Sequence, residues 1–225
     1  MYNVQVSLEH YEFLKYVTEP RWCSYYKQIE EIINSKAKSV LLIGVGDGIV
    51  PYIISKICSD IKVATFDFSD ELKPDICGDV RELSSYFDGV SEYDAIVCCQ
   101  VLEHLPYDEF DKILYQIKMC LKESGKFILS LPDRGVKVRF LLHIPKLLDI
   151  KFLFNIPRIW CKKFIFNGEH YWEINSTWMQ RSKKIRKVID NHFVIEKEYL
   201  VEQNTYHRFY IGSPRVAKNI SNIIQ

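Results

Sequence analysis

The stretch that decides the fold is Val40-Leu-Leu-Ile-Gly-Val-Gly-Asp-Gly48, an apolar run that leads into three glycines at alternate positions. An uninterrupted apolar run of this kind is typical of a strand that is buried on both faces of a parallel sheet. Glycine in the following turn lets a ligand approach the backbone closely, because no Cβ stands in the way. A helix is expected from about residue 48 to residue 57. The stretch therefore predicts a strand, a ligand-binding turn and a helix.

Outward from this stretch, strand and helix patterns alternate over most of the chain, which predicts an α/β fold with helices on both faces of a mostly parallel sheet. The last two strands are expected to form a hairpin. Further strands are expected at 61–66, 75–78, 93–99, 126–131, 193–201 and 206–212, and further helices at 21–34, 108–122 and 177–190.

A length of 225 residues suits a single domain, 1–225, with additions. We expect four parts within it. They are an N-terminal helical cap (1–37), a cofactor-binding core (38–132), a basic and apolar insertion or lid (133–176) and a C-terminal helix and hairpin (177–225).

Composition narrows the class of protein. The net charge of +1 lacks the basic excess of a nucleic-acid-binding domain, so no nucleic acid partner is expected. The absence of a signal peptide or a spanning apolar run indicates a cytoplasmic protein. None of the seven cysteines forms a Cys-x-x-Cys pair, which indicates reduced thiols and no zinc or other metal site.

The glycine turn has competing interpretations. A phosphate-binding loop needs Lys and Ser or Thr after the last glycine, where Ile49 and Val50 stand. The dinucleotide fingerprint needs glycine or alanine at the position of Ile49. A loop that wraps a cofactor without phosphates fits the pattern, and a plain structural turn is the alternative.

Two acids follow the turn, each at the end of a predicted strand. Asp67 lies nineteen residues past Gly48 and could accept both ribose hydroxyls of an adenosine. Asp79 could accept from the adenine amino group, with Phe68 or Val80 against the ring face. A lone acid there is usually a turn or helix cap, whereas two acids in this order after a glycine loop are more specific.

These segments resemble class I S-adenosylmethionine-dependent methyltransferases, in particular the type 11 group that includes ubiquinone- and menaquinone-biosynthesis enzymes. The resemblance is strong over 38–132, and Tyr93-Asp-Ala-Ile-Val-Cys-Cys-Gln-Val-Leu-Glu-His-Leu-Pro106 is a close match. It implies a Rossmann-like sheet of seven strands with the last one antiparallel, and S-adenosylmethionine as methyl donor. Cofactor contacts are expected from Gly44, Val45, Gly46, Asp47, Gly48, Asp67, Phe68, Asp79, Val80 and Cys99.

A softer resemblance concerns the acceptor. The segments Asn167-Gly-Glu-His-Tyr-Trp-Glu-Ile174 and Tyr206-His-Arg-Phe209 are similar to bacterial methyltransferases of surface-polysaccharide gene clusters. This implies a glycan-like acceptor. Methyltransferases that act on nucleic acid amines carry Asn/Asp-Pro-Pro-Tyr/Phe where this chain has residues 99–102, so base methylation is not expected.

Methylation of a hydroxyl benefits from a general base, and histidine titrates in the useful range. His170, with Glu169 or Tyr171, is the first candidate, and His104 is the second. Trp172 is expected to stack on a sugar ring, with Glu103 also at the acceptor pocket. Alternatively, residues 103–104 hold the loop and residues 169–173 form a packed corner. His207 is expected to be structural, on an edge strand.

The segment 134–166 carries eight Lys or Arg and one acid among many apolar residues. We interpret it as an insertion that covers the edge or mouth of the sheet. It could rest on an anionic membrane surface or on a lipid-diphosphate-linked acceptor. The alternative is an amphipathic lid whose lysines are solvated, because Pro145 and Pro157 interrupt any long helix.

The sequence thus predicts O-methylation of a small or glycan-like acceptor, in the assembly of envelope polysaccharide, with S-adenosylhomocysteine as product. One alternative is a small aromatic or quinone-like acceptor. The other is a catalytically silent cofactor-binding regulatory module.

Overall fold

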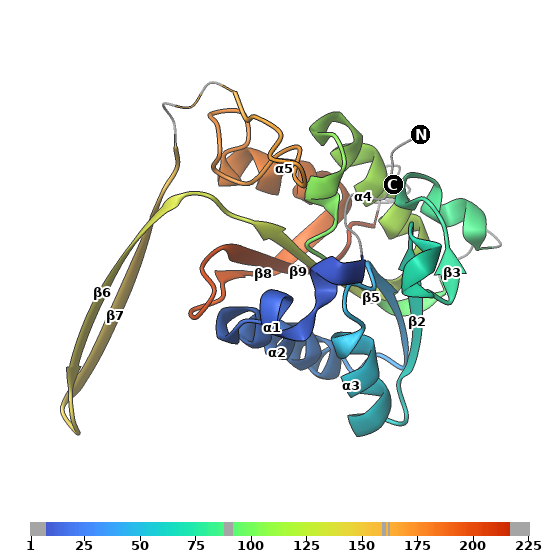
Figure 1. The fold of residues 1–225 in the computed structure, drawn as a ribbon, viewed down its shortest axis with the longest axis horizontal. Helices are drawn as coiled ribbons and strands as arrows, with labels where there is room; N and C mark the ends of the chain where they lie inside the picture. The colour runs from blue at the N-terminus through green and yellow to red at the C-terminus, as the bar shows by residue number, and fades with distance from the viewer. Residues whose placement is uncertain (1–7, 88–91, 159–160, 162, 217–225) are drawn as a thin grey trace, which may run out of the picture.

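The computed structural model describes residues 8–87, 92–158, 161 and 163–216, and its centre is a seven-stranded sheet with helices on both faces (Figure 1). The strand order is β3-β2-β1-β4-β5-β9-β8. Pairing is parallel from β3 to β5, and β9 runs antiparallel to both β5 and β8. This confirms the predicted Rossmann-like sheet with an antiparallel last strand.

The strands of this sheet agree with the predicted ones to within a few residues, except that β5 begins earlier. They are β1 (Ser39–Ile43), β2 (Lys62–Asp67), β3 (Ile76–Cys77), β4 (Tyr93–Cys99), β5 (Leu121–Pro132), β8 (Phe193–Leu200) and β9 (His207–Pro214). The α-helices are α1 (Phe13–Tyr16), α2 (Glu19–Asn34), α3 (Ile49–Ile57), α4 (Phe110–Cys120) and α5 (Ser182–His192). Short 3₁₀ helices are η1 (Leu8–Tyr11), η2 (Asp70–Leu72), η3 (Val80–Tyr86), η4 (Leu102–His104) and η5 (Tyr107–Glu109).

The central strands are apolar throughout because each face of the sheet has its own helical layer. In β1, Val40 and Leu42 belong to one buried cluster with residues of α2 and α3. Leu41 and Ile43 belong to a second cluster with residues of α4 and α5. Successive side chains of a strand point to opposite faces, so a doubly covered strand needs apolar residues at every position.

A second, two-stranded sheet follows β5, and it corrects the interpretation of the insertion. Strands β6 (Val136–Ile144) and β7 (Leu148–Ile156) pair antiparallel as a hairpin. This hairpin projects away from the body instead of covering the edge or mouth of the large sheet (Figure 1). Pro145 lies in the turn of the hairpin and Pro157 follows its second strand, and the alternation of apolar residues makes strands.

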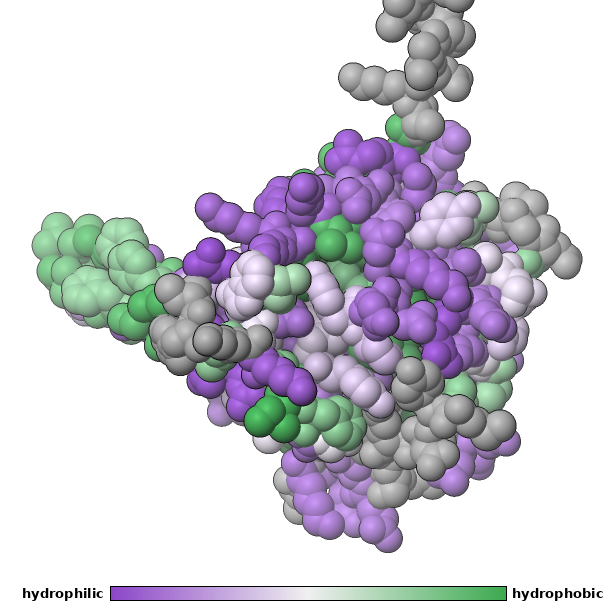
Figure 2. Space-filling view, turned by 90° about the horizontal axis from the view of Figure 1, so that it is seen from above, coloured by the Kyte–Doolittle hydropathy of each residue, from purple (hydrophilic) through white to green (hydrophobic). Residues whose placement is uncertain are grey.

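One face of the hairpin is entirely apolar, because opposite residues of paired strands share a face. We call it the apolar hairpin face. Its members are Val136, Val138, Phe140, Leu142, Ile144, Leu148, Ile150, Phe152, Phe154 and Ile156. Phe140, Phe152 and Phe154 are 53%, 54% and 59% exposed. Figure 2 shows the hairpin as an apolar lobe beside a largely hydrophilic body.

The other face of the hairpin is turned to the body. Arg139 donates from its guanidinium to the carbonyl of Glu202, in the turn between β8 and β9. Lys151 Nζ lies 3.7 Å from the Glu202 carboxylate. Two of the basic residues that suggested a membrane contact are therefore paired within the chain. No helix of the described ranges is long and apolar enough to span a membrane.

Candidate active site

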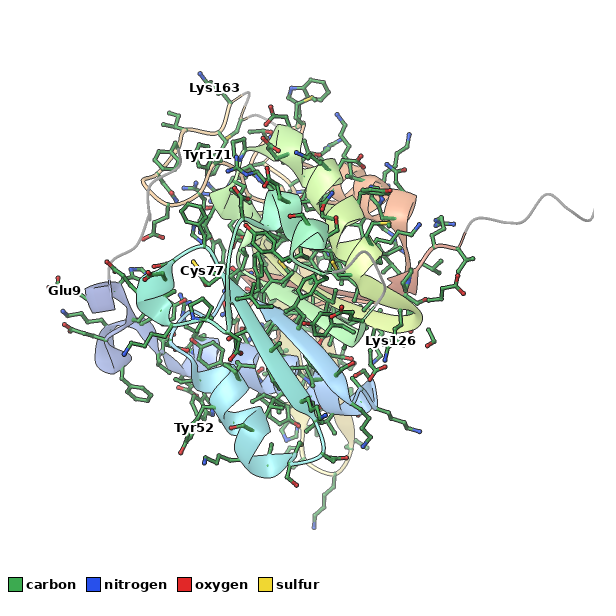
Figure 3. All side chains as sticks on the ribbon, turned by 90° about the vertical axis from the view of Figure 1, so that its right-hand side faces the viewer. Glu9, Tyr52, Cys77, Lys126, Lys163 and Tyr171 are labelled. Atoms are coloured by element: carbon green, nitrogen blue, oxygen red, sulfur yellow. The ribbon has the colours of Figure 1, made fainter. Side chains whose placement is uncertain are left out.

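A cavity of about 390 Å³ opens at the carboxyl ends of the parallel strands. It lies where β1 has β2 on one side and β4 on the other, the position at which α/β sheets bind ligands. In Figure 3, Cys77 at the end of β3 and Tyr171 lie on this side of the sheet, and Lys126 lies on the opposite side. The expected site residues that line the cavity are Gly44, Gly46, Asp67, Phe68, Asp79, Val80, Cys99, His104, Glu169 and His170.

The glycine turn forms one wall. Gly44, Gly46 and Gly48 all have positive φ angles, of 86°, 57° and 72°, which favour glycine. A Cβ on Gly44 would lie 2.4 Å from Cγ2 of Val101. A side chain at this position would both strain the backbone and displace the loop after β4, so the turn requires glycine for geometric reasons.

Three residues of the turn that are expected to contact the cofactor, Val45, Asp47 and Gly48, are not among those that line the cavity. The Asp47 carboxylate accepts from the Tyr25 hydroxyl at 2.6 Å and from the Ile49 amide at 3.1 Å. It therefore caps α3. Val45 donates its amide to Asp67 at 2.8 Å, and Gly48 begins the helix.

Asp67 connects the turn to the end of β2. One carboxylate oxygen accepts from the Val45 amide and the other accepts from the Ser69 amide at 2.9 Å. Each oxygen keeps further lone pairs, and the residue lines the cavity. The geometry fits a carboxylate that receives two neighbouring hydroxyls, so the predicted ribose contact is compatible with the structure.

Asp79 lies further along the same edge, after β3. Its carboxylate accepts from the guanidinium and the backbone amide of Arg81. The ion pair with Arg81 lowers the pKa of Asp79, so the carboxylate is charged at neutral pH. Phe68 is 48% exposed and, with Val80, supplies apolar surface beside it. These residues fit a flat, amino-bearing ring.

The opposite wall carries two histidines whose ring centroids lie 4.9 Å apart. Nδ1 of His104 donates to the carbonyl of Glu169 at 3.0 Å, so Nε2 carries the lone pair. Burial lowers the pKa of His104 to about 4. This imidazole is therefore neutral at physiological pH and can accept a hydrogen bond.

His170 has a different electrostatic environment. Its Nδ1 lies 3.1 Å from the Glu173 carboxylate, which accepts a hydrogen bond from it. Burial lowers the pKa of His170, but the hydrogen bond to Glu173 and the negative charge of Glu103 outweigh it, and the net shift is upward. A histidine held in this way accepts a proton at Nε2 and is stabilised when charged.

Glu103 lies behind the two histidines and does not line the cavity. Its side chain is fully buried, and neither oxygen has a hydrogen-bond partner in the described part of the chain. Burial raises the pKa of Glu103 to about 7. A metal ion could be held by three side chains here, because one oxygen or nitrogen atom from each lies within 4.8 Å of the others. These side chains are Glu103, His104 and His170. The cysteine spacing that indicated no metal site does not bear on this cluster.

Trp172 cannot stack on a sugar, contrary to expectation, because it is fully buried. Its ring packs against Phe110 and Tyr107, with centroids 5.0 and 5.1 Å apart, and its Nε1 donates to the Leu105 carbonyl. Tyr171 also lies outside the cavity lining, with its ring 4.7 Å from that of Phe166. The alternative of a packed corner therefore holds for these two residues.

Several lining residues were missed. The N-terminal segment contributes four of them, and β9 and the turn before it contribute two more. His207 lies on an internal strand, not an edge strand, and burial lowers its pKa to about 3. The only signal for the first group was the density of aromatic residues before α2. Among the residues missed are His10, Tyr11, Tyr16, Arg21, Tyr206 and His207.

Comparisons with solved structures agree with this architecture. A protein from Pyrococcus horikoshii OT3 is 17% identical, with a TM-score of 0.56, over 93% of this chain and all of that one. An S-adenosylmethionine-dependent methyltransferase from Clostridium acetobutylicum is 13% identical (TM-score 0.56; 92% and 96% covered). The glycopeptide N-methyltransferase MtfA, complexed with S-adenosylhomocysteine, is 10% identical (TM-score 0.56; 86% and 89% covered). At these identities the likeness concerns the fold.

Sequence comparison supplies the family. No curated protein matches the chain by sequence. The sequence model of a methyltransferase domain family matches residues 13–181, which include the glycine turn, both acids and both histidines. The match covers well over half of the chain, and the chain belongs to this methyltransferase domain family.

Proposed function

We propose that this enzyme methylates a hydroxyl oxygen of a small or glycan-like acceptor, with His170 as the general base. The observation that carries the proposal is the pair formed by His170 and Glu173 in the wall of the donor cavity. A hydroxyl is a weak nucleophile until its proton is removed, and a positioned base contributes about a hundredfold or more in rate.

The donor half of the cavity fits S-adenosylmethionine. The backbone of Gly44 and Gly46 would surround the methionine part, Asp67 would accept the ribose hydroxyls, and Asp79 would accept from the adenine amino group. Phe68 would cover the ring. When bound, the cofactor supplies an electrophilic methyl group on a sulfonium, so the protein's task is to position the acceptor in line with it.

The part of the cavity near His170 would bind the methyl acceptor, and it carries the group that takes up the proton. Glu173 holds Nδ1 of His170 as the donor of its hydrogen bond, which leaves Nε2 to take the hydroxyl proton. The acceptor oxygen would form its bond to the methyl group as the proton moves to Nε2. The carboxylate then stabilises the imidazolium that results, which is the role of the acid in other histidine–acid pairs.

The polarity of this half favours a glycan-like acceptor over an aromatic or quinone-like one. Neutral His104, Asn167, Glu169 and Tyr206 line it with hydrogen-bonding groups. Several hydroxyls of one sugar could be bound at once by such a wall. The role in envelope polysaccharide assembly rests on the resemblance of residues 167–174 to enzymes of that kind.

The first experiment separates donor binding from turnover. We expect S-adenosylhomocysteine at a hundred times its dissociation constant to stabilise the wild type by about 2.7 kcal/mol, or roughly 5–10 °C, and to have little effect on Asp67→Ala. His170→Ala should keep the donor-induced shift and lose turnover on glycan acceptors, whereas His143→Ala on the hairpin should keep both. Equal loss of binding and turnover in His170→Ala would make His170 structural. Turnover with aromatic acceptors alone would favour the quinone-like alternative, and donor binding without turnover on any acceptor would favour the silent module.

A further inference from the structure

The apolar hairpin face is the largest feature of the molecule that the proposed methyl transfer does not use. It presents ten apolar side chains and no charged one. An isolated two-stranded hairpin is marginally stable in water and needs packing on one face. Soluble monomers rarely expose a contiguous apolar patch above roughly 300–600 Å². This face therefore requires a partner.

We propose that the apolar hairpin face packs against the same face of a second copy of this chain, so that the enzyme is a homodimer joined by its hairpins. A two-fold axis brings one patch against an identical patch, and a flat, uncharged face meets its own copy with no charge left unpaired. The two hairpins would then stack as a four-stranded sandwich with a core about 10 Å thick.

The area of the face suits such an interface. Ten side chains of about 150–200 Å² each, roughly half exposed, offer on the order of 800 Å² of apolar surface. A stable interface of ordinary size buries about 800 Å² on each partner. The hairpin face alone therefore supplies the area that a dimer needs, without any contribution from the body.

The placement of the charges favours a second copy over an anionic membrane. A surface helix or hairpin that binds anionic lipids carries its cations where they can reach the headgroups. Here Arg139 and Lys151 are on the opposite face, where both contact Glu202. These contacts hold the polar face against the body and leave the uncharged face directed outward.

Light scattering with size-exclusion chromatography tests the proposal on the full chain. We expect the wild type to elute with a mass twice the 26.6 kDa of one chain. Phe140→Glu with Phe152→Glu, a directly opposed pair on the apolar hairpin face, should elute as a monomer. The matched control places the same charges on the opposite face, as Leu141→Glu with Leu153→Glu, and should remain a dimer.

Donor binding checks that the variants are folded. The hairpin projects from the body, so both double variants should keep the thermal shift with S-adenosylhomocysteine. At nanomolar chain concentration, where the proposed dimer is dissociated, both should unfold in urea like the wild type. If Phe140→Glu with Phe152→Glu does not fold, Val138→Lys with Phe154→Lys, the adjacent opposed pair, replaces it. A dimer that dissociates while methyl transfer persists would leave the proposed function intact.

Other results overturn the proposal. A wild type that stays monomeric at chain concentrations up to about 100 µM excludes a specific dimer. A monomer that sediments with phosphatidylcholine–phosphatidylglycerol vesicles, and no longer does so with Phe140→Glu and Phe152→Glu, would assign the face to a membrane. A dimer that survives both apolar-face variants would place the interface elsewhere.

Discussion

The strands at the centre of the sheet and the strands of the hairpin are both rich in apolar residues, but the residues pack differently in the two regions. In β1, four consecutive apolar residues, Val40 to Ile43, pack alternately against the two helical layers. In β6, apolar residues recur at every second position and share one exposed face. Packing within the chain stabilises the first region, whereas the second is stabilised by the partner that we propose covers it.

Asp133 lies at the junction of the two regions, and its loss should have the largest effect. Its buried carboxylate accepts from Arg208 and Asn175 and pairs with Lys137. Asp133→Ala leaves these cations without their acid, and we expect it to lower the free energy of unfolding by about 3–5 kcal/mol in urea titrations. Glu71→Ala, at an exposed site, should change it by less than about 0.5 kcal/mol. Equal stabilities would mean that the junction contributes nothing.

Acid titration of the same residue sharpens this test. Burial raises the pKa of Asp133, but the charges of Arg208 and Lys137 outweigh burial, and the net pKa is lowered. A carboxyl with a depressed folded pKa stabilises the protein above its unfolded pKa, and that contribution is lost as the pH falls through the folded value. The wild type should therefore lose more stability than Asp133→Ala between pH 5 and pH 2, measured by urea unfolding.

Two leucine-to-alanine substitutions, one in each region, compare how much a buried and an exposed leucine contribute to the free energy of unfolding. Leu41 in β1 is fully buried, and Leu142 in β6 is 39% exposed. Leu41→Ala should cost about 2–5 kcal/mol of unfolding free energy because it leaves a cavity. Leu142→Ala should cost less than about 1 kcal/mol when measured at nanomolar chain concentration, where the proposed dimer is dissociated. A cost at Leu142 as large as that at Leu41 would contradict the distinction between the regions.

The pH dependence of turnover concerns the catalytic region alone. His170 must be neutral to accept a proton, and its pKa is raised above the ordinary value of 6.5. The rate should therefore rise with pH through that raised pKa. Glu173→Gln removes a hydrogen-bonded charge, so the acidic limb of kcat/KM should move to lower pH while the maximal rate falls. An unmoved limb would identify another base. Hairpin variants should leave the profile unchanged.

Deleting the hairpin should have the smallest effect on the sheet. A variant in which a short Gly-Ser linker replaces residues 138–154 keeps every strand of the large sheet and both hairpin residues that contact Asp133, Lys137 and Asn155. Its thermal shift with S-adenosylhomocysteine should match that of the wild type within 1–2 °C, by differential scanning fluorimetry. A lost shift would show that the hairpin supports the donor site.

The donor half could be predicted from the sequence because its residues lie close together in sequence and follow strand ends. The turn at Gly44–Gly48 and the acid at Asp67 are fixed by short connections between adjacent parallel strands. The first strand of the hairpin could also have been predicted, because Val136, Val138 and Phe140 alternate with Lys137 and Arg139. The two prolines and the excess of basic residues favoured the interpretation as a lid instead.

The acceptor half was harder to predict because tertiary packing decides it. The neighbouring sequence does not tell whether a tryptophan stacks on a sugar or is buried in the core. Trp172 is buried against Phe110. The N-terminal residues His10 and Tyr11 reach the cavity only once α2 packs on the sheet. Glu103 was found by its proximity to His104, but its lack of a hydrogen-bond partner is visible only in three dimensions.

The position of β9 has a consequence for the order in which the chain folds. This strand, His207–Pro214, lies between β5 and β8 and pairs with both. It is synthesised after every other strand of this sheet, so β5 keeps an open edge until β9 has emerged from the ribosome. Nascent chains that stall before residue 207 would expose a long apolar strand to other chains, and they would be natural clients of chaperones that bind unpaired strand edges.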